Sequence, residues 1–283
     1  MVRVPELPVQ STVRPGEVRA GLPASAPETP QPLSDLIQAL DEVVVPGLTL
    51  TQSPGFYGWF PSNASLASVL GDYVSSGLGA LGITWQSAPA LTEVEQVVTE
   101  WLRELTGLSP QWRGAIQDTA STGTLVALMA ARERASGMSI DRGGLQSSER
   151  PLVVYSSEHA HSSVAKAVLL AGFGRDTLRH IEVDPVTYAM RPEALRAAMA
   201  ADVAAGRTPA AVVAAIGTTG TTAMDPVREI CAVAAEFGAW VHVDAAMAGS
   251  AMLLPECRGL FDGVDLADSL VWNPHKWIGT ILD

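Results

Sequence analysis

The sequence predicts an α/β fold built around a mostly parallel sheet with helices on both faces. After Pro151, short apolar segments typical of strands alternate with helical segments, and this alternation implies right-handed crossovers between parallel strands. Hydrophobic residues make up 47% and charged residues 17% of the 283 residues, which is enough apolar material for a sizeable core. The predicted strands are Leu152–Ser156, Leu178–Val183, Ala211–Ile216, Trp240–Asp244 and Ser269–Trp272, and the predicted helices lie near residues 160–171, 192–205 and 226–237.

The residues before the predicted sheet are expected to form an arm and a set of helices. Residues 1–32 hold seven prolines and predict an extended or disordered arm. Ser34 is a candidate N-cap for a helix that Pro46 and Gly47 end. The domains expected are therefore the arm, a helical segment at 33–110 and a large domain at 111–283.

Three further helices are expected from apolar spacing and from glycines that end helices. One covers residues 64–80, after an aromatic loop at 50–63. The next follows Pro89 and ends at Gly107, and the last begins near Ser121 and ends at Gly137.

Charge and cysteine content narrow the choice of partners. The net charge of −12 disfavours nucleic acid and anionic membranes as partners. Cys231 and Cys257 do not form a disulfide framework, and no Cys/His spacing suggests a metal site. We find no signal peptide and no apolar run long enough to span a membrane, so a cytoplasmic protein is expected.

Polar and reactive residues follow four of the predicted strands. They are His161, the run GTTGTT that starts at Gly217, Asp244, and the segment Asn273–Lys276. Ligands of open parallel sheets bind beyond the carboxyl ends of the strands, where these residues would meet. The sequence therefore predicts a site at this edge.

Lys276 is the candidate nucleophile. The chain has 18 basic residues, of which only Lys166 and Lys276 are lysines. A lysine amine forms a Schiff base with an aldehyde when part of it is neutral, whereas arginine does not lose its proton. The alternative is an ordinary surface lysine, which the apolar neighbours Trp272, Pro274 and Trp277 disfavour.

Asp244 ends a buried strand, where a carboxylate needs a partner. A pyridinium N–H is one such partner, and the small residues Ala245 and Ala246 leave space for a flat ring. A helix cap or an ion pair with arginine is the alternative.

Two further features fit a phosphorylated ring. The segment Thr119-Ala120-Ser121 opens a helix, and helix N-termini bind phosphate, although a plain cap is the alternative. An imidazole at His161 could stack on a ring and exchange protons near neutral pH, although a satisfied loop histidine is the alternative.

Seven segments together resemble the pyridoxal-phosphate-dependent group II amino-acid decarboxylases, the family of aromatic-L-amino-acid decarboxylase. They run in family order from about residue 33 to the end of the chain. The segments are SPGFYGWFPSN, SSGLGALGITWQSAPALTEVEQVV, TASTGTLVALMAAR, YSSEHAHSSVAKA, AIGTTGTTAMDP, WVHVDAAMAGSA and LADSLVWNPHKW.

The resemblance implies pyridoxal 5′-phosphate as cofactor and a fold-type-I (aspartate-aminotransferase-like) large domain. It implies that Lys276 binds the cofactor covalently, that Asp244 pairs with the pyridine nitrogen and that His161 stacks on the ring. It assigns Asp225 a supporting role nearby. The remaining cofactor-binding residues that it implies are Ala120, Ser121, Thr219, Ala246, Asn273 and His275.

The resemblance also implies a reaction, a substrate side and a partner. The reaction is decarboxylation of an L-amino acid to the amine and CO₂, in a homodimer whose N-terminal segment wraps the partner. An aromatic substrate fits the flat apolar residues predicted on the substrate side, Trp59, Phe60 and Trp85, which accompany Ser62. Trp59 and Ser62 depart from the Tyr and Thr common in the family, and Thr119 stands where Ser is common.

Three alternatives to this reaction remain open. The same cofactor supports oxidative deamination to an aldehyde, or transamination. The third alternative is a non-catalytic fragment, because the family continues past the lysine with further strands, a small domain and a mobile loop that helps choose between amine and aldehyde. We expect a large domain that is incomplete at its C-terminus.

Overall fold

The structure, a computed structural model, describes residues 6–147 and 150–281. The chain forms two compact units, Met1–Asn63 and Ala64–Asp283. The first unit contains the α-helices α1 (Glu17–Ala20) and α2 (Leu33–Ala39). The second contains helices α3 (Leu66–Leu78), α4 (Pro89–Thr106), α5 (Ala120–Ala135), α6 (Ser162–Leu170), α7 (Pro192–Ala204), α8 (Val227–Glu236) and α9 (Pro274–Trp277), and strands β1 (Leu152–Ser157), β2 (Leu178–Ile181), β3 (Thr208–Ala215), β4 (Trp240–Asp244) and β5 (Ser269–Val271).

The five strands form one parallel sheet in the order β2-β1-β3-β4-β5. The chain steps from β1 outward to β2 and then returns past β1 to β3, so the direction of winding reverses between β1 and β3. All five carboxyl ends lie at one edge, and the crevice at such a reversal is the usual ligand site of open α/β sheets. The predicted fold class is confirmed, and each strand lies within three residues of its predicted bounds.

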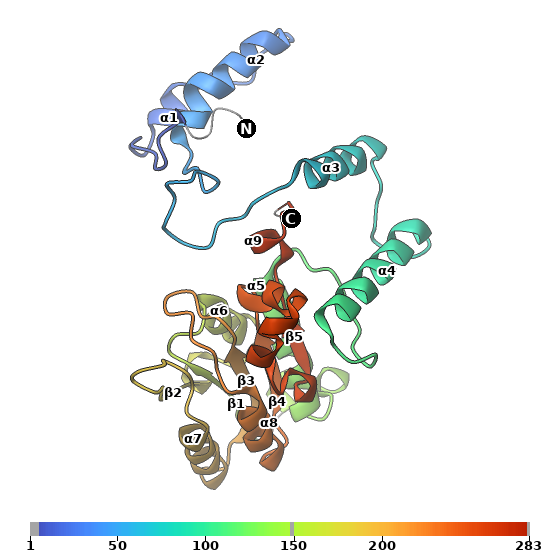
Figure 1. The fold of residues 1–283 in the computed structure, drawn as a ribbon, viewed down its shortest axis with the longest axis vertical. Helices are drawn as coiled ribbons and strands as arrows, with labels where there is room; N and C mark the ends of the chain where they lie inside the picture. The colour runs from blue at the N-terminus through green and yellow to red at the C-terminus, as the bar shows by residue number, and fades with distance from the viewer. Residues whose placement is uncertain (1–5, 148–149, 282–283) are drawn as a thin grey trace. The chain divides into compact units, whose positions relative to one another are not determined.

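Helices cover both faces of the sheet (Figure 1). Leu128 of α5 and Val164 of α6 belong to a buried apolar cluster with Val154 of β1 and Val213 of β3 on one face. Helices α7 and α8 pack against β3 and each other on the opposite face. β1 is buried along its whole length because both of its faces are covered.

A buried ion cluster ties α7 to β1 and β2. Asp202 of α7 is 4% exposed. Its carboxylate accepts hydrogen bonds from Arg179 of β2 at 2.9 and 3.0 Å, from Arg207 at 2.8 Å and from the Tyr155 hydroxyl of β1 at 3.0 Å. Burial alone would raise the pKa of Asp202, but these three partners outweigh burial and hold the pKa below its ordinary value.

We expect Asp202→Asn to lower the free energy of unfolding by about 2 kcal/mol at pH 7, less than for a fully buried pair because both arginines are partly exposed. A depressed carboxylate pKa stabilises the fold above the unfolded-state pKa, so this contribution should disappear as the pH falls below about 4. Urea denaturation at several pH values measures both effects. Asp262→Asn, which breaks the exposed Arg228 pair, is the control and should change stability little. Equal losses in the two variants would contradict this account.

The N-terminal unit differs from the sequence prediction in two places. Ser34 is not the N-cap, because α2 already begins at Leu33 and the Ser34 hydroxyl bonds to Asp35. The helix continues through a π-helical segment, Leu40–Val44, and a 3₁₀ turn, Val45–Gly47. A short helix, α1, also lies in the segment predicted as an extended arm, where Glu17 accepts a hydrogen bond from the backbone N–H of Arg14.

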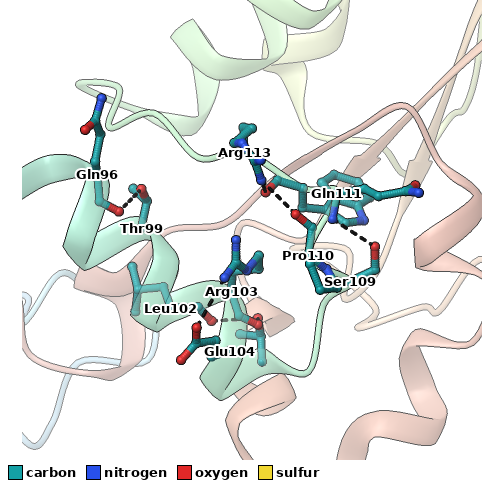
Figure 2. A network of polar contacts seen from close by, with 11 residues as sticks. Gln96, Thr99, Leu102, Arg103, Glu104, Ser109, Pro110, Gln111 and Arg113 are labelled. Carbon is teal, nitrogen blue, oxygen red and sulfur yellow. Dashed lines mark hydrogen bonds and ion pairs between the residues drawn. The ribbon is translucent and has the colours of Figure 1, made fainter.

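The end of α4 follows the prediction closely. Gly107 adopts a left-handed conformation with φ of 76°, and the N–H groups of Gly107 and Leu108 bond back to Glu104 and Arg103. Figure 2 shows polar contacts within α4 and in the segment that follows it, among them the 2.7 Å hydrogen bond from Arg113 to the carbonyl of Pro110. Among the described residues, no helix has the length and apolar character needed to cross a membrane.

Candidate active site

A pocket of about 170 Å³ opens at the carboxyl ends of the strands. Its lining residues come from the ends of β1, β3, β4 and β5 or the loops after them, and from the first turn of α5. Segments far apart in the sequence therefore meet there. Its lining residues are Thr119, Ala120, Ser121, His161, Ser163, Ala215, Gly217, Thr218, Thr219, Asp244, Ala246, Met247, Asn273, His275 and Lys276.

All nine predicted catalytic and cofactor-binding residues line this pocket, which brings them together as the sequence indicated. Their individual roles stay predictions. The prediction missed Ala215 and Met247, which have no reactive group, whereas Gly217 and Thr218 belong to the predicted GTTGTT run. Ser163 could have been found, because it lies two residues from His161.

Lys276 lies in the short helix α9. The N-cap of this helix, Asn273, and the residue before Lys276, His275, are both buried. Burial lowers the pKa of Lys276 below its ordinary value, and the negative charge of Asp244 offsets part of this effect. A lowered pKa increases the fraction of neutral amine at neutral pH. Lys276 is thus suited to attack an aldehyde carbon.

Asp244 is the last residue of β4 and lines the same pocket as Lys276. One carboxylate oxygen accepts a hydrogen bond from the N–H of Ala246 at 3.1 Å, which fixes the side chain at the strand end. Ala245 and Ala246 are buried and small, so they leave room beside the carboxylate. This arrangement can hold a cationic group of a flat ligand.

The first turn of α5 also contributes residues to the pocket. The Thr119 hydroxyl caps the helix by accepting a hydrogen bond from the N–H of Thr122 at 3.2 Å. Ala120 and Ser121 are the first two residues of α5 and line the pocket, and N–H groups in the first turn of a helix have no acceptor within that helix. Two such N–H groups at the start of a 16-residue helix suit a phosphate.

His161 is the N-cap of α6. Its Nδ1 atom accepts a hydrogen bond from the N–H of Ser163 at 3.2 Å and lies 2.9 Å from the Ser163 hydroxyl. Since Nδ1 accepts this bond, the neutral ring carries its proton on Nε2. This second nitrogen remains for a ligand in the pocket.

The residues predicted on the substrate side are not among those that line this pocket. Trp85 belongs to the loop between α3 and α4, is 55% exposed and does not line the pocket. Trp59, Phe60 and Ser62 belong to the first unit, where the Trp59 ring contacts Phe56 edge-on at a centroid distance of 5.0 Å. Their assignment to the substrate stays a prediction.

Asp225 supports the pocket wall without lining it. It is 4% exposed, and its two oxygens accept hydrogen bonds from the N–H groups of Ala215 and Met190 at 2.8 and 2.7 Å. Ala215 does line the pocket. Burial raises the pKa of Asp225 to about 6, although the two backbone hydrogen bonds work in the opposite direction.

A raised carboxyl pKa has a definite consequence for stability. The folded state holds its proton up to a pH of about 6, whereas the ordinary value is 3.8, so the contribution of Asp225 to the free energy of unfolding should fall as the pH rises through this window and stay constant above it. Urea denaturation of wild type and Asp225→Asn between pH 3.5 and 8 measures the difference, with those limits chosen as roughly bracketing both values. A difference that is independent of pH would contradict the expectation.

Comparison with known proteins gives a consistent match. The family described as "Pyridoxal-dependent decarboxylase conserved domain" matches residues 15–283. The chain is 40% identical to "L-tyrosine/L-DOPA decarboxylase 2" of Lophophora williamsii over 99% of this chain and 54% of the relative. It is 41% identical to "Phenylacetaldehyde synthase" of Arabidopsis thaliana over 99% of this chain and 58% of the relative.

A solved structure agrees with this match. The crystal structure of Oryza sativa TDC with PLP and tryptamine superimposes with a TM-score of 0.93 at 40% identity and covers 100% of this chain and 61% of that chain. The chain therefore spans little more than half the length of the relatives it matches.

The donor set of the pocket fits pyridoxal phosphate at each of its functional ends. The helix N-terminus suits the phosphate, the Asp244 carboxylate suits the ring nitrogen, and a partly neutral Lys276 amine suits the aldehyde. Because both the sequence match and this donor set lead to the same cofactor, we conclude that the chain belongs to the pyridoxal-dependent decarboxylase family and carries its pyridoxal-phosphate site.

Proposed function

We propose that the whole protein removes the α-carboxylate of an aromatic L-amino acid and releases the amine and CO₂. The observation that carries this proposal is the pocket itself, in which the Lys276 amine of lowered pKa lies with Asp244 and the α5 N-terminus. Membership of the family supports the reaction type.

Each residue would contribute one function. Lys276 would hold the cofactor covalently and yield its place to the amino group of the substrate. The N–H groups of Ala120 and Ser121 would bind the phosphate. Asp244 would hold a proton on the ring nitrogen, and His161 would lie against the ring and offer Nε2 to the substrate.

Bound pyridoxal phosphate supplies an electron-withdrawing ring that takes up the electron pair of the broken bond. The protein then has two tasks. It must orient the substrate so that the bond to the carboxylate stands out of the ring plane, and it must keep the negative charge of Asp244 beside the ring nitrogen. Small residues in the pocket wall, such as Ala246, would leave room for the flat ring.

The aromatic substrate is the finer part of the proposal. Relatives with 40% identity include a decarboxylase named for tyrosine and DOPA. The predicted substrate-side residues Trp59, Phe60 and Trp85 carry flat apolar side chains, a type that suits an aromatic substrate. A panel of amino acids assayed for CO₂ release tests this point, and preferential release from a non-aromatic amino acid would overturn it.

A second outcome is favoured by one specific observation. The chain is 41% identical to a phenylacetaldehyde synthase, against 40% for the tyrosine/DOPA decarboxylase reported above. That route would give the aldehyde and ammonia together with CO₂ and would consume an oxidant such as O₂. Product analysis of the whole protein separates the two: amine with CO₂ supports decarboxylation, whereas aldehyde and ammonia with little amine overturn it.

Residues 1–283 alone provide a further test. The chain spans 54–58% of the two curated relatives, so a non-catalytic fragment is the alternative to an active enzyme. Cofactor binding with turnover would exclude the fragment alternative. Binding without turnover would support it and would place the remaining chemistry outside this chain.

We also propose a homodimer. Helix α3 has no buried residue, and its large apolar side chains Leu66, Leu70, Tyr73 and Leu78 are 55–76% exposed. Faces of this kind mark protein contacts. Sedimentation equilibrium of the whole protein measures the oligomeric state, and a monomer at micromolar concentration would contradict the proposal.

A further inference from the structure

His242 is a buried imidazole that the proposed chemistry leaves unused. It lies in the middle of β4 and is 1% exposed. Both ring nitrogens have hydroxyl partners: Nδ1 lies 2.8 Å from Ser269 Oγ and Nε2 lies 3.3 Å from Thr124 Oγ1. Ser269 Oγ also accepts a hydrogen bond from the indole of Trp240 at 2.8 Å.

These contacts join α5, β4 and β5. Each of these elements carries, or leads directly into, residues that are predicted to hold the cofactor. Thr124 of α5 lies one turn after Ser121, and Ser121 is one of the pocket residues predicted to bind the phosphate. Asp244 lies two residues after His242 on β4, and alternate residues of a strand project from the same face. Ser269 begins β5, which leads into Asn273 and Lys276.

His242 also carries no charge at neutral pH. Burial lowers its pKa to about 4, although the negative charge of Asp244 acts in the opposite direction. Both hydrogen-bond partners are neutral hydroxyls, which satisfy a neutral imidazole. An uncharged ring beneath Asp244 does not compete for its carboxylate, so that charge remains for a cationic group in the pocket.

We propose that His242 is a positioning residue, which joins α5, β4 and β5 and so fixes the phosphate anchor relative to the Asp244 anchor. This inference rests on the proposed function. Its physical basis is preorganisation: a ligand held at two ends gains from the second contact only when the two anchors already stand at the right separation.

The experiment compares pyridoxal phosphate with pyridoxal, which lacks the phosphate. Spectroscopic titration of the chain gives a dissociation constant for each probe, and the ratio of the two measures the benefit of engaging both anchors at once. In His242→Leu we expect this ratio to fall about tenfold. A purely structural loss of folded protein would weaken both probes equally and would leave the ratio unchanged.

Three further variants make the test specific. Thr124→Val removes only the hydroxyl on the α5 side and should also lower the ratio, whereas His242→Gln keeps a donor and an acceptor and should restore most of it. Thr106→Val is the matched control, because Thr106 is a buried helical threonine whose hydroxyl bonds only to its own helix, and its ratio should equal that of wild type.

The outcomes separate this inference from the proposed function. If the wild-type chain does not bind pyridoxal phosphate, the cofactor site assigned to this pocket fails and the inference fails with it. If wild type binds and both His242→Leu and Thr124→Val keep the wild-type ratio, only the inference is overturned. Should His242→Leu not fold, Thr124→Val decides: a lowered ratio supports the role of the bridge and an unchanged ratio overturns it.

Discussion

Lys276→Ala is expected to abolish covalent binding of pyridoxal phosphate and to lower turnover of the whole protein by at least about 10³-fold. Lys276 is the only lysine that lines the pocket, and burial lowers its pKa toward the range in which the amine is a nucleophile. Alanine removes the amine without adding bulk. The loss of covalent cofactor is measured by the protein's visible absorbance after desalting, and turnover is measured by CO₂ release.

The chain offers a matched control for this prediction. Lys166 is the only other lysine, and it lies exposed on α6. Lys166→Ala should retain the absorbance and the turnover of wild type. Loss of the covalent cofactor in Lys166→Ala, with retention in Lys276→Ala, would show that the assignment is wrong.

Asp244→Asn is expected to lower turnover by roughly 10²–10³-fold while the cofactor still binds to Lys276. The amide keeps the shape of the carboxylate but loses the negative charge that would hold the ring nitrogen protonated. Steady-state kinetics should show the loss mainly in kcat, because the charge matters most when the ring takes up electrons.

A second readout of Asp244→Asn is the pH dependence. The charge of Asp244 raises the pKa of Lys276, so its removal should lower that pKa further. Titration of Lys276 in the cofactor-free chain, followed through the pH dependence of its reaction with added pyridoxal phosphate, measures the change in wild type and variant. A variant with wild-type kcat and an unchanged titration would contradict the proposed pairing of Asp244 with the cofactor.

The strands of the sheet could be predicted from the sequence because the residue patterns that indicate a strand are local. β1 and β3 are short, mainly apolar runs, and Trp240–Asp244 has the predicted bounds. The N-terminal unit was harder. The π-helical segment Leu40–Val44 and the early start of α2 at Leu33 depend on backbone hydrogen bonds that residue type does not specify.

The site was predictable wherever a residue carries its own chemistry. Lys276, Asp244 and His161 are reactive side chains at strand or helix ends, and parallel topology places those ends together. His242 gave no such signal, because a histidine inside a strand is informative only when its partners are known. Those partners, Thr124 and Ser269, lie 118 and 27 residues away along the chain.

The central claim is that this pocket binds pyridoxal phosphate through Lys276. Reduction of the cofactor-loaded chain with borohydride, followed by proteolysis and mass spectrometry, tests it most directly, because reduction makes the bond to lysine permanent. The two lysines of the chain give a binary readout. We predict a phosphopyridoxyl group on the peptide that contains Lys276 and none on the peptide that contains Lys166. Modification of Lys166 alone, or of neither lysine at saturating cofactor, would contradict the claim.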